Sequence, residues 1–185
     1  MALNRYYWPT KFNSRKDFLK QGVKCIFISH QQKDAKQAIK IADYLMSVGI
    51  DVYIDKYDKD LKIHHQLNNA KAVTDSIRKG INNSSHMLVL VSPNTLFSTW
   101  VPFEIGYGYD KTDLLTLSLK GIPKGGLPEY LKSTKIIRDI YDLNNLIENF
   151  KGITKSVLLE SKIISNYNDI KNPLNDVMDS LISEK

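Results

Sequence analysis

Met87-Leu88-Val89-Leu90-Val91-Ser92 is the stretch of sequence that decides the fold. Its five consecutive apolar residues end at a serine, a length and composition typical of a strand buried on both faces. Residues 24–28 and 50–54 form two similar runs earlier in the chain. Apolar residues at helical spacing over 35–46 and 67–81 predict helices between these runs. Strands that alternate with helices in this way predict right-handed βαβ units and a parallel sheet.

The chain beyond this stretch continues the α/β pattern less regularly. Two weaker strands are expected near 114–119 and 135–140, with a connection rich in Gly and Pro between them. Short amphipathic helices are predicted around 143–150, 157–164 and 174–182. We therefore expect one doubly wound α/β domain with additions at both ends: an N-terminal arm (1–23), the α/β domain (24–150) and a helical C-terminal extension (151–185).

The composition is that of an ordinary globular domain. The 185 residues are 42% hydrophobic and 25% charged, which argues against disorder and favours one domain with a sizeable core. The single cysteine, Cys25, excludes a disulfide framework and a multi-cysteine zinc site, and we expect it to be a buried strand residue. No apolar run approaches the ~20 residues that cross a bilayer, and no signal-peptide pattern is present. These features predict a cytoplasmic protein with no membrane partner.

Positive charge is concentrated in the N-terminal arm. Residues 1–24 carry six Lys or Arg and one acidic residue, a net of +5, whereas the whole chain carries +6. The rest of the chain is thus near neutral, and no specific nucleic-acid partner is expected. The arm also contains Arg5-Tyr6-Tyr7-Trp8-Pro9, in which three aromatic rings follow a cation. These rings either form a flap over a ligand site or an assembly contact, or they cover one end of the sheet.

The carboxyl ends of the strands are where open parallel sheets bind ligands, at the point where the strand order reverses. In a flavodoxin-like order 2-1-3-4-5 this point lies between the first and third strands, which end in Ser29-His30 and Ser92. Trp100 and Glu104 follow and, being four residues apart, share one face of a helix. An aromatic plane beside a carboxylate suits a ligand with a ring and a developing positive charge. The alternative is a core tryptophan beside a solvent-facing glutamate.

Other kinds of site have less support in the sequence. His64 and His65 are adjacent, whereas two metal ligands on one helical face are spaced i,i+4, so no metal site is expected there. The chain has neither a Gly-x-Gly-x-x-Gly run nor a P-loop, which removes the two common phosphate-binding motifs. Acidic residues do not cluster after the first strand, as they would in a response-regulator receiver.

Four blocks of this sequence together resemble a Toll/interleukin-1 receptor (TIR) domain. They stand in the family's order and at its usual separations, and the resemblance covers about residues 24–150. The blocks are Cys25-Ile26-Phe27-Ile28-Ser29-His30, Ile50-Asp51-Val52-Tyr53-Ile54-Asp55, Met87-Leu88-Val89-Leu90-Val91-Ser92 and Trp100-x-x-x-Glu104-Ile105. The resemblance implies a flavodoxin-like sheet of five parallel strands flanked by helices, with a loop after the second strand at 55–68.

TIR domains divide into adaptors that only assemble and enzymes that cleave NAD+, and this chain resembles the enzymes at Trp100-x-x-x-Glu104. The resemblance implies that Glu104 is the catalytic glutamate. Its carboxylate would stabilise the oxocarbenium-like ribosyl centre as nicotinamide leaves as a neutral molecule, so that no general acid is needed. NAD+ would be the substrate, with no separate cofactor and no metal. The residues expected to bind it beside Glu104 are Ser29, His30, Ser92, Trp100 and, from the arm, Tyr7.

The same resemblance implies a biological setting. Stand-alone TIR proteins of this size resemble the signal-generating component of Thoeris-type anti-phage systems, which make a cyclic ADP-ribose messenger for a separate effector. Homotypic TIR–TIR self-association is a further implication. Two alternatives stay open: a non-catalytic TIR scaffold or host-mimicking effector, and an enzyme like the nucleoside deoxyribosyltransferases, which also cut N-glycosidic bonds with a glutamate.

Overall fold

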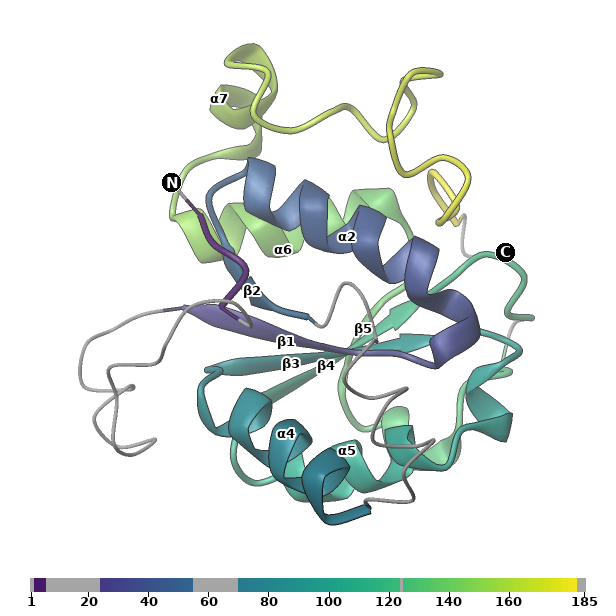
Figure 1. Cartoon of the computed structure of the whole chain (residues 1–185). Coiled ribbons are helices and arrows are strands. Elements are labelled where there is room, and N and C mark those ends of the chain that lie inside the picture. Colours follow the sequence, from purple (N-terminus) through teal and green to yellow (C-terminus); the bar gives the residue numbers. More distant parts are fainter. Residues whose placement is uncertain (1, 6–23, 55–69, 124, 183–185) are drawn as a thin grey trace.

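Five parallel strands form the centre of the computed structural model, which describes residues 2–5, 24–54, 70–123 and 125–182. Helices cover both sides of this sheet (Figure 1). The elements in chain order are β1 (Cys25–Ser29), η1 (Gln32–Asp34), α2 (Ala35–Ser47), β2 (Asp51–Tyr53), α4 (Ala70–Asn82), β3 (His86–Val91), η2 (Thr95–Phe97), α5 (Trp100–Gly108), β4 (Asp113–Ser118), η3 (Glu129–Leu131), β5 (Lys135–Ile137), α6 (Ile140–Lys151) and α7 (Lys155–Glu160), where η marks a 3-10 turn.

The strand order is β2-β1-β3-β4-β5, and each neighbouring pair is parallel. The chain order reverses between β1 and β3, so the ends of these two strands flank the place where such sheets bind ligands. Their register pairs Ser29, the last residue of β1, with Val89. The predicted flavodoxin-like α/β fold is therefore confirmed.

Side-chain alternation along the strands divides the core into two halves. On β3, Leu88 and Leu90 pack with α2, α6 and the C-terminal extension, whereas Met87, Val89 and Val91 pack with α4 and α5. Figure 1 shows these helices on opposite sides of the sheet. Residues 87–91 of β3 are covered by helices on both faces of the sheet. Every side chain in this run is therefore buried and apolar, which explains the unbroken apolar run in the sequence.

A glycine sets the distance between α4 and the sheet. A Cβ atom on Gly80 would lie 2.6 Å from the ring of Tyr53 and 2.7 Å from the ring of Phe27. These two rings stack on each other, with centroids 5.9 Å apart, and belong to the half of the core that α4 covers. Any side chain at position 80 would therefore push α4 away from β1 and β2.

The first described residues of the arm lie along the edge of β2. The backbone N–H of Leu3 donates to Oδ1 of Asp51 at 3.0 Å, and Asn4 forms a parallel bridge with Val52. Arg5 Nε donates to Oδ2 of the same aspartate at 2.7 Å. Backbone pairing thus begins before the first strand, where the sequence pattern predicted only an arm. The aromatic cluster, including Tyr7, lies outside the described residues.

The C-terminal extension packs onto the core without the last predicted helix. α7 forms, but residues 174–182 are a series of turns, so the helix predicted there is wrong. The carbonyl of Val177 accepts from the N–H of Lys120, and that of Asp179 accepts from the N–H of Ile140, each at 2.9 Å. These carbonyls serve neighbouring segments instead of a helix of their own. Their segment is nevertheless part of the core through the buried side chains of Leu174, Val177 and Met178.

The fifth strand is also shorter than predicted. β5 ends at Ile137, because Asp139 is the N-cap of α6 and accepts the backbone N–H of Asp142 at 2.8 Å. The loop expected at 55–68, with His64 and His65, lies outside the described residues.

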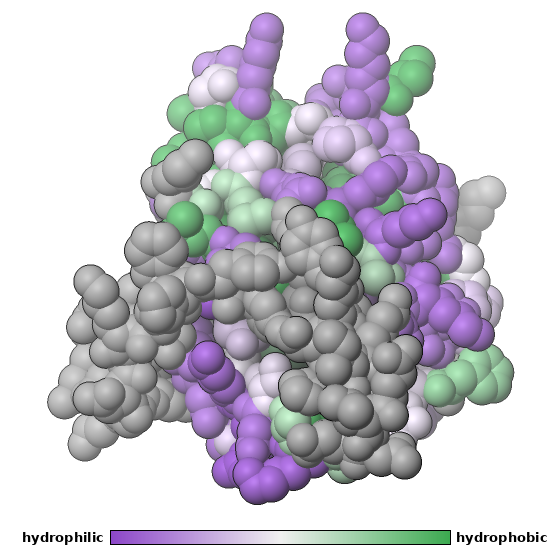
Figure 2. All heavy atoms as spheres, viewed as in Figure 1, coloured by the Kyte–Doolittle hydropathy of each residue, from purple (hydrophilic) through white to green (hydrophobic). Residues whose placement is uncertain are grey.

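Apolar side chains remain at the surface of the C-terminal extension. Ile153, Val157 and Ile163 are between 37% and 50% exposed. Figure 2 shows apolar atoms gathered in this region, at the top of the view. Among the described residues, no helix combines the length and hydrophobicity that crossing a membrane requires.

Candidate active site

A hydrogen bond between Ser29 and Glu104 joins the end of β1 to the middle of α5. Ser29 Oγ donates to Oε2 of Glu104. Ser29 lies two residues after Phe27 and four after Cys25, so it faces the same side of the sheet as they do, the side that α5 covers. Ser29 is fully buried and Glu104 is 9% exposed. The alternative of a solvent-facing glutamate is therefore wrong.

Burial changes the acidity of Glu104. Removal from water disfavours the charged carboxylate and raises the pKa of Glu104 from 4.5 to about 8, and the hydrogen bond from Ser29 opposes part of this rise. The other carboxyl oxygen, Oε1, accepts no hydrogen bond from the described residues. The site thus holds a buried carboxyl group with a pKa of about 8, and one of its two oxygens is bonded to Ser29.

Trp100 begins α5, one helical turn before Glu104. Its ring is half-buried and packs against the half of the core that α4 and α5 share. It meets the ring of Phe103 edge-on, with centroids 6.0 Å apart, and Phe103 stacks on Tyr107 one turn further along. An aromatic stripe therefore runs along α5 from Trp100, while Val101 and Ile105 fill the core side.

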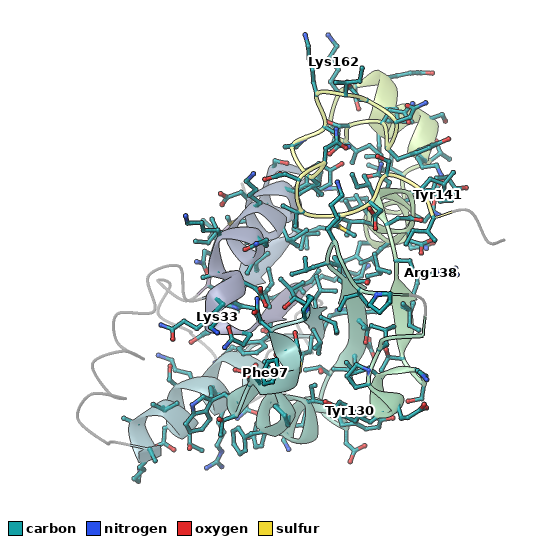
Figure 3. All side chains as sticks on the ribbon, turned by 90° about the vertical axis from the view of Figure 1, so that its right-hand side faces the viewer. Lys33, Phe97, Tyr130, Arg138, Tyr141 and Lys162 are labelled. Carbon is teal, nitrogen blue, oxygen red and sulfur yellow. The ribbon has the colours of Figure 1, made fainter. Side chains whose placement is uncertain are left out.

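Ser92 is bonded to a buried aspartate that the sequence analysis missed. Asp34, 2% exposed at the end of η1, accepts from Ser92 Oγ and, at 2.7 Å, from Asn94 Nδ2. The Ser92 hydroxyl also accepts the N–H of Asn94 at 3.0 Å. These bonds connect the turn after β1 to the turn after β3. Lys33 and Phe97, labelled in Figure 3, mark these two turns on the ribbon.

A signal for Asp34 does exist in the sequence. An aspartate directly before an apolar-periodic helix is typical of an N-cap. Here, however, its side chain makes no capping bond to α2 and turns to Ser92 and Asn94 instead. The N-cap pattern would therefore have found the residue but not its partners.

His30, another predicted site residue, directly follows Ser29 and is half-buried, with Nδ1 3.3 Å from the carbonyl oxygen of Ile28. The structure thus brings Ser29, His30, Ser92 and Glu104 to one edge of the sheet, with the Ser29–Glu104 pair in direct contact.

Two other reactive groups can be assessed. Cys25 is fully buried at the start of β1, and burial raises the pKa of its thiol to about 12. This agrees with the predicted core residue and argues against a thiolate nucleophile. Within the described part of the chain, no three His, Cys, Asp or Glu residues group as metal ligands would.

Comparison with known protein families identifies the family to which this fold belongs. Residues 26–149 match the family model of the TIR domain. The chain belongs to the TIR-domain family. The predicted resemblance is confirmed at this level, and the TIR match includes all of β1 but its first residue, α5 and the Ser29–Glu104 pair.

Two individual proteins are similar to this TIR chain. The "Probable 3' cyclic ADP-D-ribose synthase ThsB'" of Bacillus cereus (strain MSX-D12) is 26% identical over 95 residues, which cover 50% of this chain. The match spans 47% of that protein, about half its length. The crystal structure of the TIR domain of the Toll-related receptor TRR-2 from Hydra magnipapillata has a TM-score of 0.49 and 14% identity, covering 75% of this chain and 96% of that one.

Proposed function

We propose that this TIR protein cleaves the bond between nicotinamide and ribose in NAD+ and releases an ADP-ribose product. The observation that carries the proposal is the buried carboxyl group of Glu104 at the carboxyl edge of the sheet, bonded to Ser29 at the end of β1. Support comes from TIR family membership and from the similarity to a probable cyclic ADP-ribose synthase.

This reaction requires an anion to stabilise positive charge and does not require a general acid. Breaking the N-glycosidic bond moves its electron pair onto the nicotinamide ring nitrogen, so the leaving group departs neutral and takes no proton. Positive charge is left on the ribosyl carbon and ring oxygen, where an ionised Glu104 stabilises it. NAD+ itself carries a cationic pyridinium ring. That charge, placed near the carboxyl group, favours the ionised form of Glu104 and opposes the effect of burial.

The other predicted residues have supporting roles in this proposal. Trp100 forms an aromatic wall beside the reacting ribose, and His30 contacts ribose or phosphate. Ser92 binds or orients the substrate, with its position set by Asp34. Tyr7 is proposed to close over NAD+ from the arm. No separate cofactor takes part.

The setting of the activity is a second part of the proposal. Attack on the ribosyl carbon by water gives linear ADP-ribose, whereas attack by an adenine nitrogen of the same molecule gives a cyclic product. We propose a cyclic product that acts as a messenger for a separate effector in Thoeris-like anti-phage defence. Homotypic TIR–TIR contacts would assemble the active form.

A non-catalytic scaffold is the competing function. A scaffold gains nothing from a buried carboxyl group, because burial of an ionisable side chain costs stability. The Ser29–Glu104 pair therefore favours catalysis over assembly alone. A deoxyribosyltransferase-like enzyme would also use a glutamate, but membership of the TIR family favours NAD+.

The test is product analysis. Purified protein, at high concentration and with a crowding agent, is incubated with NAD+, and nicotinamide and nucleotide products are separated by chromatography. We expect equal release of nicotinamide and an ADP-ribose product, lost in Glu104→Gln. A deoxyribosyltransferase would instead exchange bases on deoxynucleosides. Absence of NAD+ consumption at every protein concentration would contradict the proposal.

A further inference from the structure

Glu104 has two carboxyl oxygens in different surroundings. Oε2 accepts the hydrogen bond from Ser29, and Oε1 accepts none from the described residues. The residue as a whole is 9% exposed. One oxygen is thus held by Ser29, and the other has no hydrogen-bond partner among the described residues.

Ser29 is well placed to hold a carboxyl group in one orientation. It is the last residue of β1, the strand that lies between β2 and β3 in the sheet, and it is fully buried. Its backbone position is set by parallel pairing with β3 opposite Val89. Because Ser29 lies on a strand that is paired on both sides, its bond to α5 holds the carboxyl of Glu104 relative to the sheet.

We infer that Ser29 is a positioning residue for catalysis: its hydroxyl holds Oε2 of Glu104 so that Oε1 faces the reacting ribose. This inference rests on the proposed NAD+ cleavage. It differs from the predicted role of Ser29, which was direct binding of NAD+. A serine that holds the glutamate is expected to change kcat, whereas a serine that binds substrate is expected to change KM.

The hydrogen bond also favours the ionised form of the carboxyl group. Among the described residues, burial and the bond from Ser29 are the two influences on the pKa of Glu104. The neighbouring carboxylate at this edge, Asp34, is bonded to Ser92 and Asn94. Removal of the Ser29 hydroxyl therefore raises the pKa of Glu104 further, and a smaller fraction is ionised at neutral pH.

The experiment compares Ser29→Ala with Ser29→Cys, which keeps a weak donor of similar size. Ser84→Ala is the matched control, because Ser84 is also a fully buried serine, and its hydroxyl donates to the carbonyl of Gly80 at 2.9 Å, at the other end of β1. The first measurement is kcat and KM for NAD+ between pH 6 and pH 9.5. The second is an NMR titration of protein with 13C-labelled glutamate carboxyl groups.

Five glutamates are present in the chain, and the resonance lost in Glu104→Gln assigns Glu104. In wild type its titration midpoint is expected near pH 8. In Ser29→Ala we expect the midpoint to rise by about one pH unit and kcat/KM at pH 7 to fall about tenfold, since a hydrogen bond to a charged group favours that form by about tenfold. KM at pH 9.5, where Glu104 is mostly ionised in both proteins, should stay within twofold of wild type. In Ser29→Cys the rise of the midpoint and the fall in kcat/KM should both be smaller than in Ser29→Ala. Ser84→Ala should show neither change.

Two results would overturn the inference. One is an unchanged midpoint in Ser29→Ala, whatever happens to activity. The other is a raised KM with an unchanged kcat at pH 9.5, which would make Ser29 a substrate contact. If wild-type protein does not cleave NAD+, the proposed function fails, and the NMR midpoints still decide whether Ser29 controls the state of Glu104.

Discussion

Replacing Glu104 with glutamine is expected to abolish NAD+ cleavage and, at alkaline pH, to stabilise the fold. Glutamine keeps the volume of the side chain, and its amide oxygen can still accept the hydrogen bond from Ser29. What it removes is the negative charge. Loss of one preorganised charge at a reacting centre typically lowers kcat by about 10²–10³.

The gain in stability follows from the pKa of Glu104. Burial raises this pKa from 4.5 to about 8, so the folded state holds the proton more tightly than the unfolded chain. The contribution of this proton to stability is fully present below about pH 4.5 and is lost progressively as the pH rises through 8. Between pH 5.5 and pH 8.5 this linkage lowers the free energy of unfolding of wild type by about 3 kcal/mol. The glutamine in Glu104→Gln does not titrate, so the free energy of unfolding of this variant does not fall for this reason.

Urea unfolding of both proteins at pH 5.5 and pH 8.5 measures the effect. The difference between the two proteins should grow by about 3 kcal/mol over this range, which removes the contributions of all other titrating groups. Glu160→Gln, at an exposed position in α7, serves as control and should show no such growth. The same pH dependence in wild type and Glu104→Gln would refute the argument from burial. NAD+ turnover of Glu104→Gln within threefold of wild type would refute its catalytic role.

Three further predictions concern the pH–rate profile, Trp100 and the fold. The kcat/KM of wild type should rise about tenfold from pH 7 to pH 9 as Glu104 ionises in the free enzyme, and a flat profile would contradict this. Trp100→Ala should raise KM for NAD+ about tenfold and Trp100→Phe much less, because phenylalanine keeps an aromatic face; equal effects of the two would argue against stacking. Met178→Ala should lower the free energy of unfolding by about 2–5 kcal/mol in urea, since Met178 is fully buried; a smaller loss would separate the C-terminal extension from the core.

Local patterns were enough to predict the central elements. The apolar run at 87–91 and the helical spacing after residue 35 predicted β3 and α2, because buried strands and amphipathic helices have different periods. The same reasoning failed at 174–182, where apolar spacing predicted a helix. There the carbonyls of Val177 and Asp179 bond to Lys120 and Ile140, partners that come from distant parts of the chain.

The sequence predicted where the candidate site lies in the fold, but it did not predict which side chains bond to one another there. Strand ends and the Trp100-x-x-x-Glu104 spacing placed the candidate residues at one edge of the sheet. Asp34 was missed, because its partners Ser92 and Asn94 lie 58 and 60 residues further along the chain. A polar residue before a helix has the same sequence signature whether it caps that helix or bonds to another loop.

The sequence by itself determined which segments of the α/β core are strands and helices, their parallel arrangement and the residues that reach the carboxyl edge, because these follow from short-range periodicity and connection rules. Only the tertiary structure decided that Glu104 is buried, that its pKa is raised to about 8 and that its partner is Ser29, 75 residues away. The reason is that desolvation and hydrogen bonding of a carboxyl group depend on what packs around it, and β1 and α5, which are far apart in the sequence, come together only in the folded structure.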